Sequence, residues 1–488
     1  MMKKRFKLAM VAGAVTVLAL GGCGTKEKES GKEKDGSGKA VIRIAYKDEN
    51  SSNPNSKKYF DELSRLMKEE EGVDVEFEVI DLPSEGYGEK LNLQLASGDI
   101  PDIIYFQGGD TTIADQGLLE DLTPLIKDSK YLKDIMEPQN EKRMENYPYL
   151  LWVRALSAST PVVKKDILDQ TTSGKELLAD PTVANYEAFF KELVGKKDSE
   201  GNAIKYAITT SGNTMELDNI FDMAFGNTQT WLKKGDGYEY KRISQNEKDK
   251  ITFYKKLYDE KLLDSQFITK KWDTKENAFY EGEAGVISGT SGKVVDMYND
   301  KVEQLNNTEL VVLPPAKDKG QGYGAVDLSK ETRGLAISSQ SENKETAFKV
   351  LDFLASPKGQ LLDRLGFADE HYKVVDGKVE ITEEGSQWYA KFWEPRTLEV
   401  GMELSQPALS AVAEDSLDKV AEYYQEDNAF IIPDDLVAKW DATENLYREY
   451  AADIITGKKD ISEFDKFVTE WEKSGGTEIT EHANKTLK

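Results

Sequence analysis

Residues 91–122, LNLQLASGDIPDIIYFQGGDTTIADQGLLEDL, carry the pattern that decides the fold of this chain. The apolar residues before Gly98 predict a helix that stops there. Residues 102–106, DIIYF, form a short continuous apolar run, which is typical of a parallel strand buried on both faces. Ligands of open parallel sheets bind at the carboxyl ends of the strands. We therefore expect Gln107 and Asp110, which follow this strand, to lie at a ligand crevice.

The sequence before this stretch extends the same pattern. Residues 41–46, VIRIAY, predict a strand, residues 59–67 have helical periodicity, and residues 73–80, VDVEFEVI, alternate as a strand does. The order strand, helix, strand, helix, strand indicates an α/β fold with half of a doubly wound sheet, because such crossovers are right-handed. Asp48 follows the first strand and lies on the same predicted rim. It is either a ligand contact or a solvated loop acid.

The rest of the chain predicts a second, helix-rich lobe. Residues 150–163, LLWVRALSASTPVV, are apolar and strand-like, as expected of a segment that crosses between lobes. A hairpin is predicted over residues 227–240, turning at GDG, and residues 284–289, AGVISG, predict a buried strand. The pattern after Glu345 is mainly helical and ends in a polar tail that holds His482.

Length and charge narrow the classes of function. With 488 residues, the chain should form more than one domain. Its net charge is −25, and 39% of its residues are hydrophobic. A surface this acidic repels nucleic acid and anionic lipid headgroups, so neither is expected as a partner.

Residues 1–23 predict a targeting segment. A basic start is followed by an apolar run of 13 residues, Leu8 to Leu20, which is too short to span a membrane. The motif LGGC, ending at Cys23, resembles a bacterial lipobox, in which the cysteine becomes the lipidated amino terminus. The alternative is an ordinary secretory signal with an incidental cysteine. Cys23 is the only cysteine, so no internal disulfide is possible. The charged low-complexity run over residues 24–40 predicts a flexible tether.

Several segments, in this order, resemble the family 1 extracellular solute-binding proteins. They are the lipobox, LASGDIPDIIYF with QGLLEDLTPLI, FYEGEAGVISG, ETAFKVLDFLASPKGQLLDRLGF, EHYKVVDGKV and EFDKFVTEWEKSGG. The last two resemble the oligosaccharide-binding lipoprotein branch in particular. Members are lipid-anchored receptors of carbohydrate ABC importers in Gram-positive bacteria.

This resemblance implies a periplasmic-binding-protein-like fold with two α/β lobes, parallel-rich sheets, a hinge, an interlobe cleft and a helical carboxyl terminus. By analogy, the first lobe comprises residues 41–156 and 333–395, and the second comprises residues 157–332 and 396–488. The implied protein is a monomer on the extracellular face of the cell membrane, with permease subunits as partners. It binds a carbohydrate, without catalysis and without a cofactor.

The resemblance also implies site residues, some of which have a structural alternative. In the first lobe they are Phe106, Gln107 and Asp110, of which Asp110 could instead cap a helix. Near the hinge, Trp152 could instead pack in the core and Arg154 could form a structural ion pair. The remaining implied contacts are Thr290, Ser291, Trp231 and Trp393. The loop after EGEAGVI reads GTSGK and lacks the aromatic residue common in the family, so Trp231 is the expected replacement, with hairpin packing as its alternative.

Three other possibilities follow from the residues. Asp198, Glu200 and Asn202 alternate as calcium ligands do, but Ala203 and Thr209 occupy the positions of the loop glycine and the bidentate glutamate, which favours a plain turn. A glycosidase or lyase with a carboxylate pair is the rival class, since the chain has 89 acidic residues but only two histidines. A surface interaction lipoprotein without a small ligand is the third class.

Overall fold

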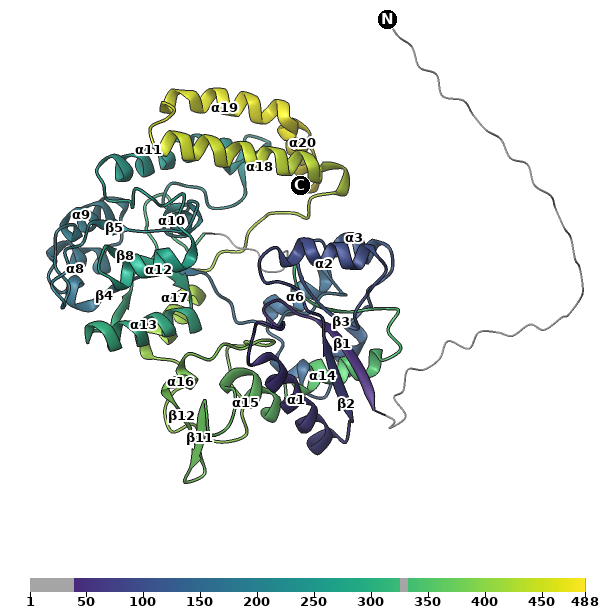
Figure 1. The fold of residues 1–488 in the computed structure, drawn as a ribbon. Helices are drawn as coiled ribbons and strands as arrows, with labels where there is room; N and C mark the ends of the chain where they lie inside the picture. Colours follow the sequence, from purple (N-terminus) through teal and green to yellow (C-terminus); the bar gives the residue numbers. More distant parts are fainter. Residues whose placement is uncertain (1–38, 325–331, 488) are drawn as a thin grey trace, which may run out of the picture.

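The structure, a computed structural model, describes residues 39–324 and 332–487. These residues form two α/β lobes, and the carboxyl-terminal helices pack on the second lobe (Figure 1). The predicted signal peptide with Cys23 and most of the predicted tether lie outside the described residues. Within the described ranges, no helix has the length and apolar composition needed to cross a membrane.

The first lobe is built on a four-stranded sheet with strand order β10-β3-β1-β2. The strands are β1 (Ala40–Ala45), β2 (Val75–Val79), β3 (Ile103–Gln107) and β10 (Arg333–Ile337). As the sequence predicts, β1 lies parallel to both β2 and β3. The apolar run in β3 is buried because it lies inside the sheet, whereas the edge strand β2 alternates between buried and exposed residues. β10 pairs with β3 in the antiparallel sense and returns the chain to this lobe.

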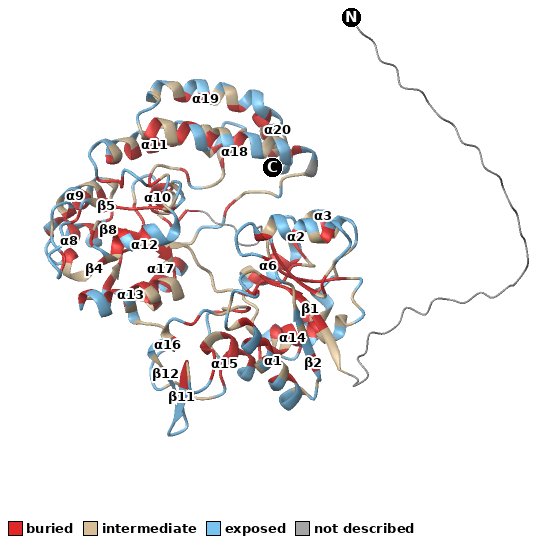
Figure 2. Ribbon diagram, in the orientation of Figure 1, coloured by how far each residue is buried: buried red, intermediate tan, exposed pale blue. Residues whose placement is uncertain are grey.

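Helices cover both faces of this sheet, and its strands β3 and β10 are mostly buried (Figure 2). α1 ends where Gly72 adopts φ +66°, in the left-handed region, and its N–H caps the carbonyl of Met67. The helices of this lobe are α1 (Ser56–Glu71), α2 (Tyr87–Ala96), α3 (Asp110–Asp115), α4 (Thr123–Lys127), α5 (Leu132–Ile135), α6 (Pro138–Asn146), α14 (Lys344–Phe353), α15 (Pro357–Leu365) and α16 (Glu383–Ser386).

One hairpin interrupts the carboxyl-terminal part that we expected to be mainly helical. β11 (Tyr372–Val375) and β12 (Lys378–Ile381) are joined by Asp376 and Gly377, both at positive φ. Asp-Gly is a strong signal for this two-residue turn. The signal was present in the sequence, within EHYKVVDGKV, and the helical interpretation overlooked it.

The second lobe has a mixed sheet with strand order β5-β8-β4-β9. The strands are β4 (Ser159–Lys164), β5 (Tyr206–Ile208), β8 (Ala284–Thr290) and β9 (Leu310–Val312). Only β5 and β8 pair in parallel, and β4 is antiparallel to both of its neighbours. The parallel-rich description therefore applies to the first lobe. The predicted hairpin is present as β6 (Trp231–Lys234) and β7 (Gly237–Tyr240).

Helices enclose the second sheet and continue into the carboxyl-terminal helices. They are α7 (Lys165–Leu168), α8 (Thr172–Ala179), α9 (Val183–Leu193), α10 (Met215–Phe221), α11 (Gln245–Asp259), α12 (Trp272–Tyr280), α13 (Lys293–Asn306), α17 (Ala411–Tyr423), α18 (Asp434–Ile455), α19 (Phe464–Trp471) and α20 (Thr477–Thr486). The expected polar tail is in fact α20. Gly475, at φ +120°, turns the chain after α19, and Ile479 and Ala483 are then buried one helical turn apart.

Two described segments connect the lobes. The first runs from Leu151, which pairs with Leu335 of β10, to Ala158, whose carbonyl accepts the N–H of Ser291 at 2.9 Å. The second follows Glu394, whose backbone pairs with that of Arg154. It stays with the first lobe beyond the expected boundary at residue 395, because the N–H of Ser405 donates to the Val379 carbonyl of β12 at 2.8 Å.

Candidate ligand-binding cavity

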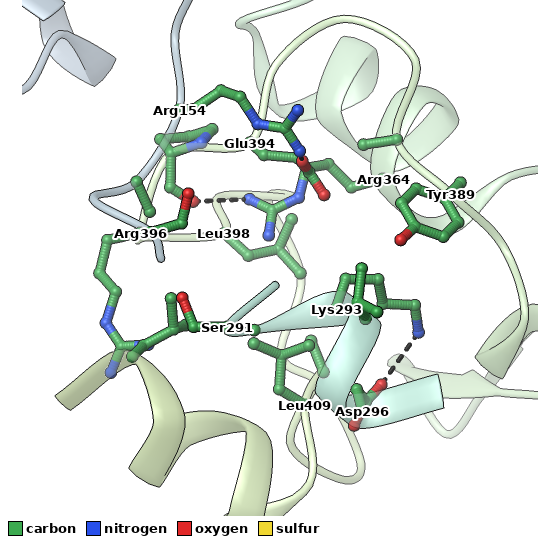
Figure 3. Close-up of a pocket in the computed structure, with 18 of the residues that line it drawn as sticks. Arg154, Ser291, Lys293, Asp296, Arg364, Tyr389, Glu394, Arg396, Leu398 and Leu409 are labelled. Atoms are coloured by element: carbon green, nitrogen blue, oxygen red, sulfur yellow. Dashed lines mark hydrogen bonds and ion pairs between the residues drawn. The ribbon is translucent and has the colours of Figure 1, made fainter. Parts of the chain in front are cut away.

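A cavity of about 650 Å³ lies between the lobes, beside the two connecting segments. Its first-lobe wall comes from α6, the end of α15 and residues 388–396, and its second-lobe wall comes from the end of β8, the start of α13 and residues 406–411. A cavity of this size suits a small ligand, since such sites measure roughly 300–1,000 Å³. Figure 3 shows polar side chains from both lobes facing this space.

The hinge contributes an ion pair and an aromatic ring. The guanidinium of Arg154 pairs with the Glu394 carboxylate, and its central carbon lies 5.2 Å from the centre of the Trp152 ring. Burial lowers the pKa of Arg154, and the neighbouring Arg333 acts in the same direction. The side chain of Asn140, in α6, donates to the Arg154 carbonyl at 3.2 Å. The first two contacts fix the direction of the Arg154 side chain, and the Asn140 bond holds its backbone.

Residues 388–396 are held against α15 by one buried carboxylate. Asp363 accepts the backbone N–H groups of Lys391 at 3.0 Å, Phe392 at 3.1 Å and Trp393 at 2.9 Å, and the Tyr59 hydroxyl at 2.8 Å. With the backbone anchored there, the neighbouring part of the segment reaches the cavity.

Tyr389 and Trp388 supply the aromatic surface of this segment. Tyr389 lines the cavity with 41% of its surface exposed, so its ring is available to a ligand. The orientation of the Trp388 ring is fixed by a hydrogen bond, in which its Nε1–H donates to the Asp363 backbone carbonyl at 2.9 Å. Sugar rings commonly pack their apolar faces on such aromatic rings.

The second-lobe wall presents hydroxyl and charged groups. Thr290 and Ser291, at the end of β8, line the cavity. Lys293 follows, and its Nζ lies 3.0 Å from the Asp296 carboxylate and also donates to the Ser386 carbonyl of the first lobe. This last contact joins the two walls at one side of the cavity. Burial raises the pKa of Asp300 here, and the neighbouring Asp296 reinforces the shift.

The structure brings four of the ten predicted contact residues to the cavity. Trp152 and Arg154 come from the hinge, and Thr290 and Ser291 come from the second lobe.

The other residues of the first-lobe crevice prediction do not line the cavity. Asp48 is an exposed loop residue at φ +69°, and Gln107 is also exposed. Phe106 is fully buried, as its central strand requires. Asp110 begins α3, and its carboxylate accepts the Tyr149 hydroxyl at 2.9 Å. Burial raises the pKa of Asp110.

Two tryptophans that were predicted to contact the ligand are buried in the protein core instead. Trp231 is 1% exposed and packs between Tyr240 and Phe430, with ring centres at 5.3 Å and 5.6 Å. This is the hairpin packing that the sequence left as its alternative. Trp393 is fully buried, and its Nε1–H donates to the Leu351 carbonyl at 3.0 Å. Each indole is thus enclosed within its own lobe.

Apart from Arg154 and Trp152, the sequence analysis missed the basic residues of the cavity and its most exposed aromatic residue. Arg143 lies in α6, Arg364 near the end of α15, and Tyr389 in a run of aromatic residues, WYAKFW. Arginines next to crossing segments in an otherwise acidic chain were an available signal. No sequence signal shows that Tyr389 faces the cavity while Trp393 is buried, because this difference depends on where Asp363 anchors the backbone.

The turn that begins at Asp198, where calcium was the less favoured alternative, is closed by its own hydrogen bonds and a lysine. One Asp198 oxygen accepts the N–H groups of Glu200 at 3.1 Å and Asn202 at 2.9 Å. The other oxygen lies 3.6 Å from the Nζ of Lys164, and both side chains are fully buried. These contacts match the turn that the sequence favoured.

One further group of metal-ligand types occurs among residues 39–324 and 332–487, namely Glu370, His371 and Glu384. The Nδ1 of His371 already accepts the Phe367 N–H at 3.1 Å, and Glu370 pairs with Lys58. Both groups are therefore engaged within the protein.

Comparisons with known proteins agree with this architecture. The sequence profile described as bacterial extracellular solute-binding protein matches residues 48–361. Lipoprotein LipO of Bacillus subtilis is 23% identical and covers 99% of each chain, and the polygalacturonan/rhamnogalacturonan-binding protein YtcQ of the same organism is 22% identical and covers 97% of each. The N-glycan transport solute-binding protein NgtS of Streptococcus pneumoniae has a similar structure, with a TM-score of 0.65, 17% identity, and coverage of 92% of this chain and 100% of that one.

Proposed function

This chain belongs to the bacterial extracellular solute-binding protein family, and we propose that it captures an oligosaccharide between its two lobes and delivers it to an ABC importer. The family consists of binding proteins, so the chain acts by binding and not as an enzyme. The observation that carries the proposal is a cavity whose walls come from both lobes and meet at the connecting segments.

The cavity chemistry supports a carbohydrate ligand. Tyr389 and Trp152 offer aromatic surface, while Ser291, Thr290 and Arg154 offer hydrogen-bonding groups. Pyranose rings need both kinds of partner, because one face is apolar and the hydroxyl rim is polar. Closure of the lobes would then bury any unmatched hydroxyl, at a cost of about 1–3 kcal/mol each, which makes binding selective. YtcQ and NgtS, whose names specify polysaccharide and N-glycan ligands, support the same class of ligand.

Membrane attachment completes the proposal. The chain would be cleaved before Cys23, lipidated there and held on the extracellular face as a monomer beside the permease subunits. The LGGC motif and the lipoprotein name of the relative LipO support this arrangement. A Cys23→Ala variant is expected to be lost from the membrane fraction, and its retention there at the normal level would contradict lipid anchoring.

Calorimetric titration with a panel of oligosaccharides tests the binding proposal. We expect one saturable site without product formation. Tyr389→Ala should weaken binding, because it removes an exposed ring from the cavity wall. Trp272→Ala is the control, since Trp272 is similarly exposed, at 43%, but lies on α12 outside the cavity.

Three results would contradict the proposal. They are the absence of binding across the panel, equal loss of affinity in both variants, and release of shorter sugars by the purified protein. The last result would assign the chain to the carbohydrate-active enzymes.

A further inference from the structure

The cavity reverses the charge balance of the chain. The whole sequence has 64 basic and 89 acidic residues. The cavity lining has six basic residues, Arg143, Arg154, Lys293, Arg333, Arg364 and Arg396, against three acidic ones, Asp296, Asp300 and Glu394. Because the surrounding surface repels anions, this local excess of positive charge needs its own explanation.

Several of these cations have carboxylate partners. Arg154 pairs with Glu394, as described above. Arg396 lies 2.7 Å from the Glu414 carboxylate and 2.8 Å from that of Asp418. Each of these pairs compensates charge within the protein.

Arg364 is different. Its Nη1 donates to the carbonyls of Pro395 at 3.0 Å and Thr397 at 3.5 Å, but no carboxylate of the described residues lies within 4.0 Å of its guanidinium. Burial lowers the pKa of Arg364 to about 10, the negative charge of Asp363 opposes this shift, and the positive charge of Arg154 reinforces it. The group remains a cation at neutral pH, since its pKa is still far above 7. Its charge is desolvated and only partly balanced, by the dipoles of the Pro395 and Thr397 carbonyls and by the more distant charge of Asp363.

The surroundings of Arg364 are open to a ligand. Figure 3 shows Arg154, Arg364 and Tyr389 around the same part of the cavity. A planar guanidinium matches a planar carboxylate in charge and geometry, and such charge-assisted pairs are stronger than neutral hydrogen bonds. An anion at this position would also relieve the repulsion between the two arginines.

We propose that the ligand is an acidic oligosaccharide, built from uronate units, whose carboxylate binds Arg364 beside Arg154 while a sugar ring packs on Tyr389. This inference rests on the proposed function and names its substrate class. A neutral oligosaccharide would leave the Arg364 charge desolvated when the lobes close, which would lower its affinity.

The test compares two trisaccharides that have the same sugar units and linkages but differ in whether their carboxyl groups are charged or esterified. The protein is titrated with trigalacturonate and with its fully methyl-esterified form, then with trimannuronate, maltotriose and xylotriose as further acidic and neutral probes. We expect the acidic sugars to bind more tightly than the ester and the neutral sugars. Losing one charge-assisted contact should weaken binding about 10- to 150-fold. This comparison uses the unmodified protein, so it does not depend on any variant folding.

Variants then assign the contact. Arg364→Gln should bring the affinities for trigalacturonate and its ester together, and Arg364→Lys should restore part of the difference. The matched control is Arg448→Gln. Arg448 is an exposed arginine of α18 that donates to the neutral side chain of Asn445 at 2.7 Å. Its substitution should leave both affinities unchanged.

The outcomes separate the inference from the function on which it rests. Equal or tighter binding of the ester or the neutral sugars would overturn the acidic ligand and leave oligosaccharide capture intact. A charge preference that persists in Arg364→Gln would overturn the assignment to Arg364. Failure of every sugar to bind would overturn the proposed function as well.

Discussion

Replacing Asp363 with asparagine should loosen the segment that carries Tyr389 and Glu394 to the cavity. The carboxylate accepts the Tyr59 hydroxyl and the N–H groups of three consecutive residues, and the side chain is fully buried. Asparagine has nearly the same shape but replaces one acceptor oxygen with an NH₂ donor. The perturbation is therefore chemical, with little change in packing.

The expected cost follows from the individual bonds. If the remaining oxygen keeps Tyr59 and Lys391, the new amide faces the N–H of Trp393, which had donated to Oδ2 at 2.9 Å. Phe392 then keeps one of its two contacts. A hydrogen bond to a charged acceptor contributes about 1.5–3 kcal/mol, so we expect a loss of about 3 kcal/mol once the donor conflict is included. At roughly 2–4 °C per kcal/mol, the melting temperature should fall by about 6–12 °C.

Thermal and urea unfolding of Asp363→Asn measure this effect. The control is Asp61→Asn, which removes an exposed carboxylate paired with Lys57 at 2.6 Å. An exposed pair of this kind contributes little, so we expect a change within about 0.5 kcal/mol. If Asp363→Asn melted at the same temperature as the control, the anchoring role given to this carboxylate would be refuted.

Further predictions concern buried charge, pH and a close backbone approach. Lys250→Met should destabilise the second lobe by about 3–5 kcal/mol in urea unfolding. The substitution removes the cation that the carboxylates of Asp218, at 2.8 Å, and Asp222 share in the interior. An unchanged urea midpoint would contradict this prediction. Burial lowers the pKa of His371, so the folded state binds this proton less readily than the unfolded chain. The neutral His371 side chain should therefore contribute its full stabilisation above about pH 6.5, and this contribution should decline as the pH falls below that value. His371→Gln should reduce the decline, which urea unfolding between about pH 7.5 and 5.5 would measure. Gly385→Ala should destabilise the first lobe beside α16, because its Cβ would meet the His371 carbonyl oxygen at 1.8 Å, and a melting temperature equal to that of the unmodified protein would contradict this.

Local sequence patterns predict much of the first lobe. The run DIIYF and the alternation in VDVEFEVI are period signals that depend on short segments alone, and the structure confirms both strands. The reversed direction of β10 and β4 could not be predicted in this way, since strand direction is a property of the whole chain path. The helix α20 was missed because only Ile479 and Ala483 mark its buried side.

The cavity residues also fall into those that local sequence predicts and those that depend on distant contacts. Trp152 and Arg154 lie within the predicted crossing segment, and Thr290 and Ser291 directly follow a predicted strand, so their placement at the cavity could be predicted. Tyr389 reaches the cavity through the anchoring of residues 388–396 by Asp363, whose partners there are 28 to 30 residues away in sequence. Arg364 reaches it because the end of α15 packs beside that segment, where its guanidinium donates to the Pro395 carbonyl.

Hydrogen–deuterium exchange with the tightest-binding oligosaccharide of the panel tests the central claim most directly. The account predicts protection in three regions that line one cavity, namely residues 152–158, residues 288–294 and residues 385–396. Protection should appear in both lobes at the same ligand concentration, because the site requires both walls. Protection confined to one lobe, or located away from these three regions, would contradict capture of the sugar between the lobes.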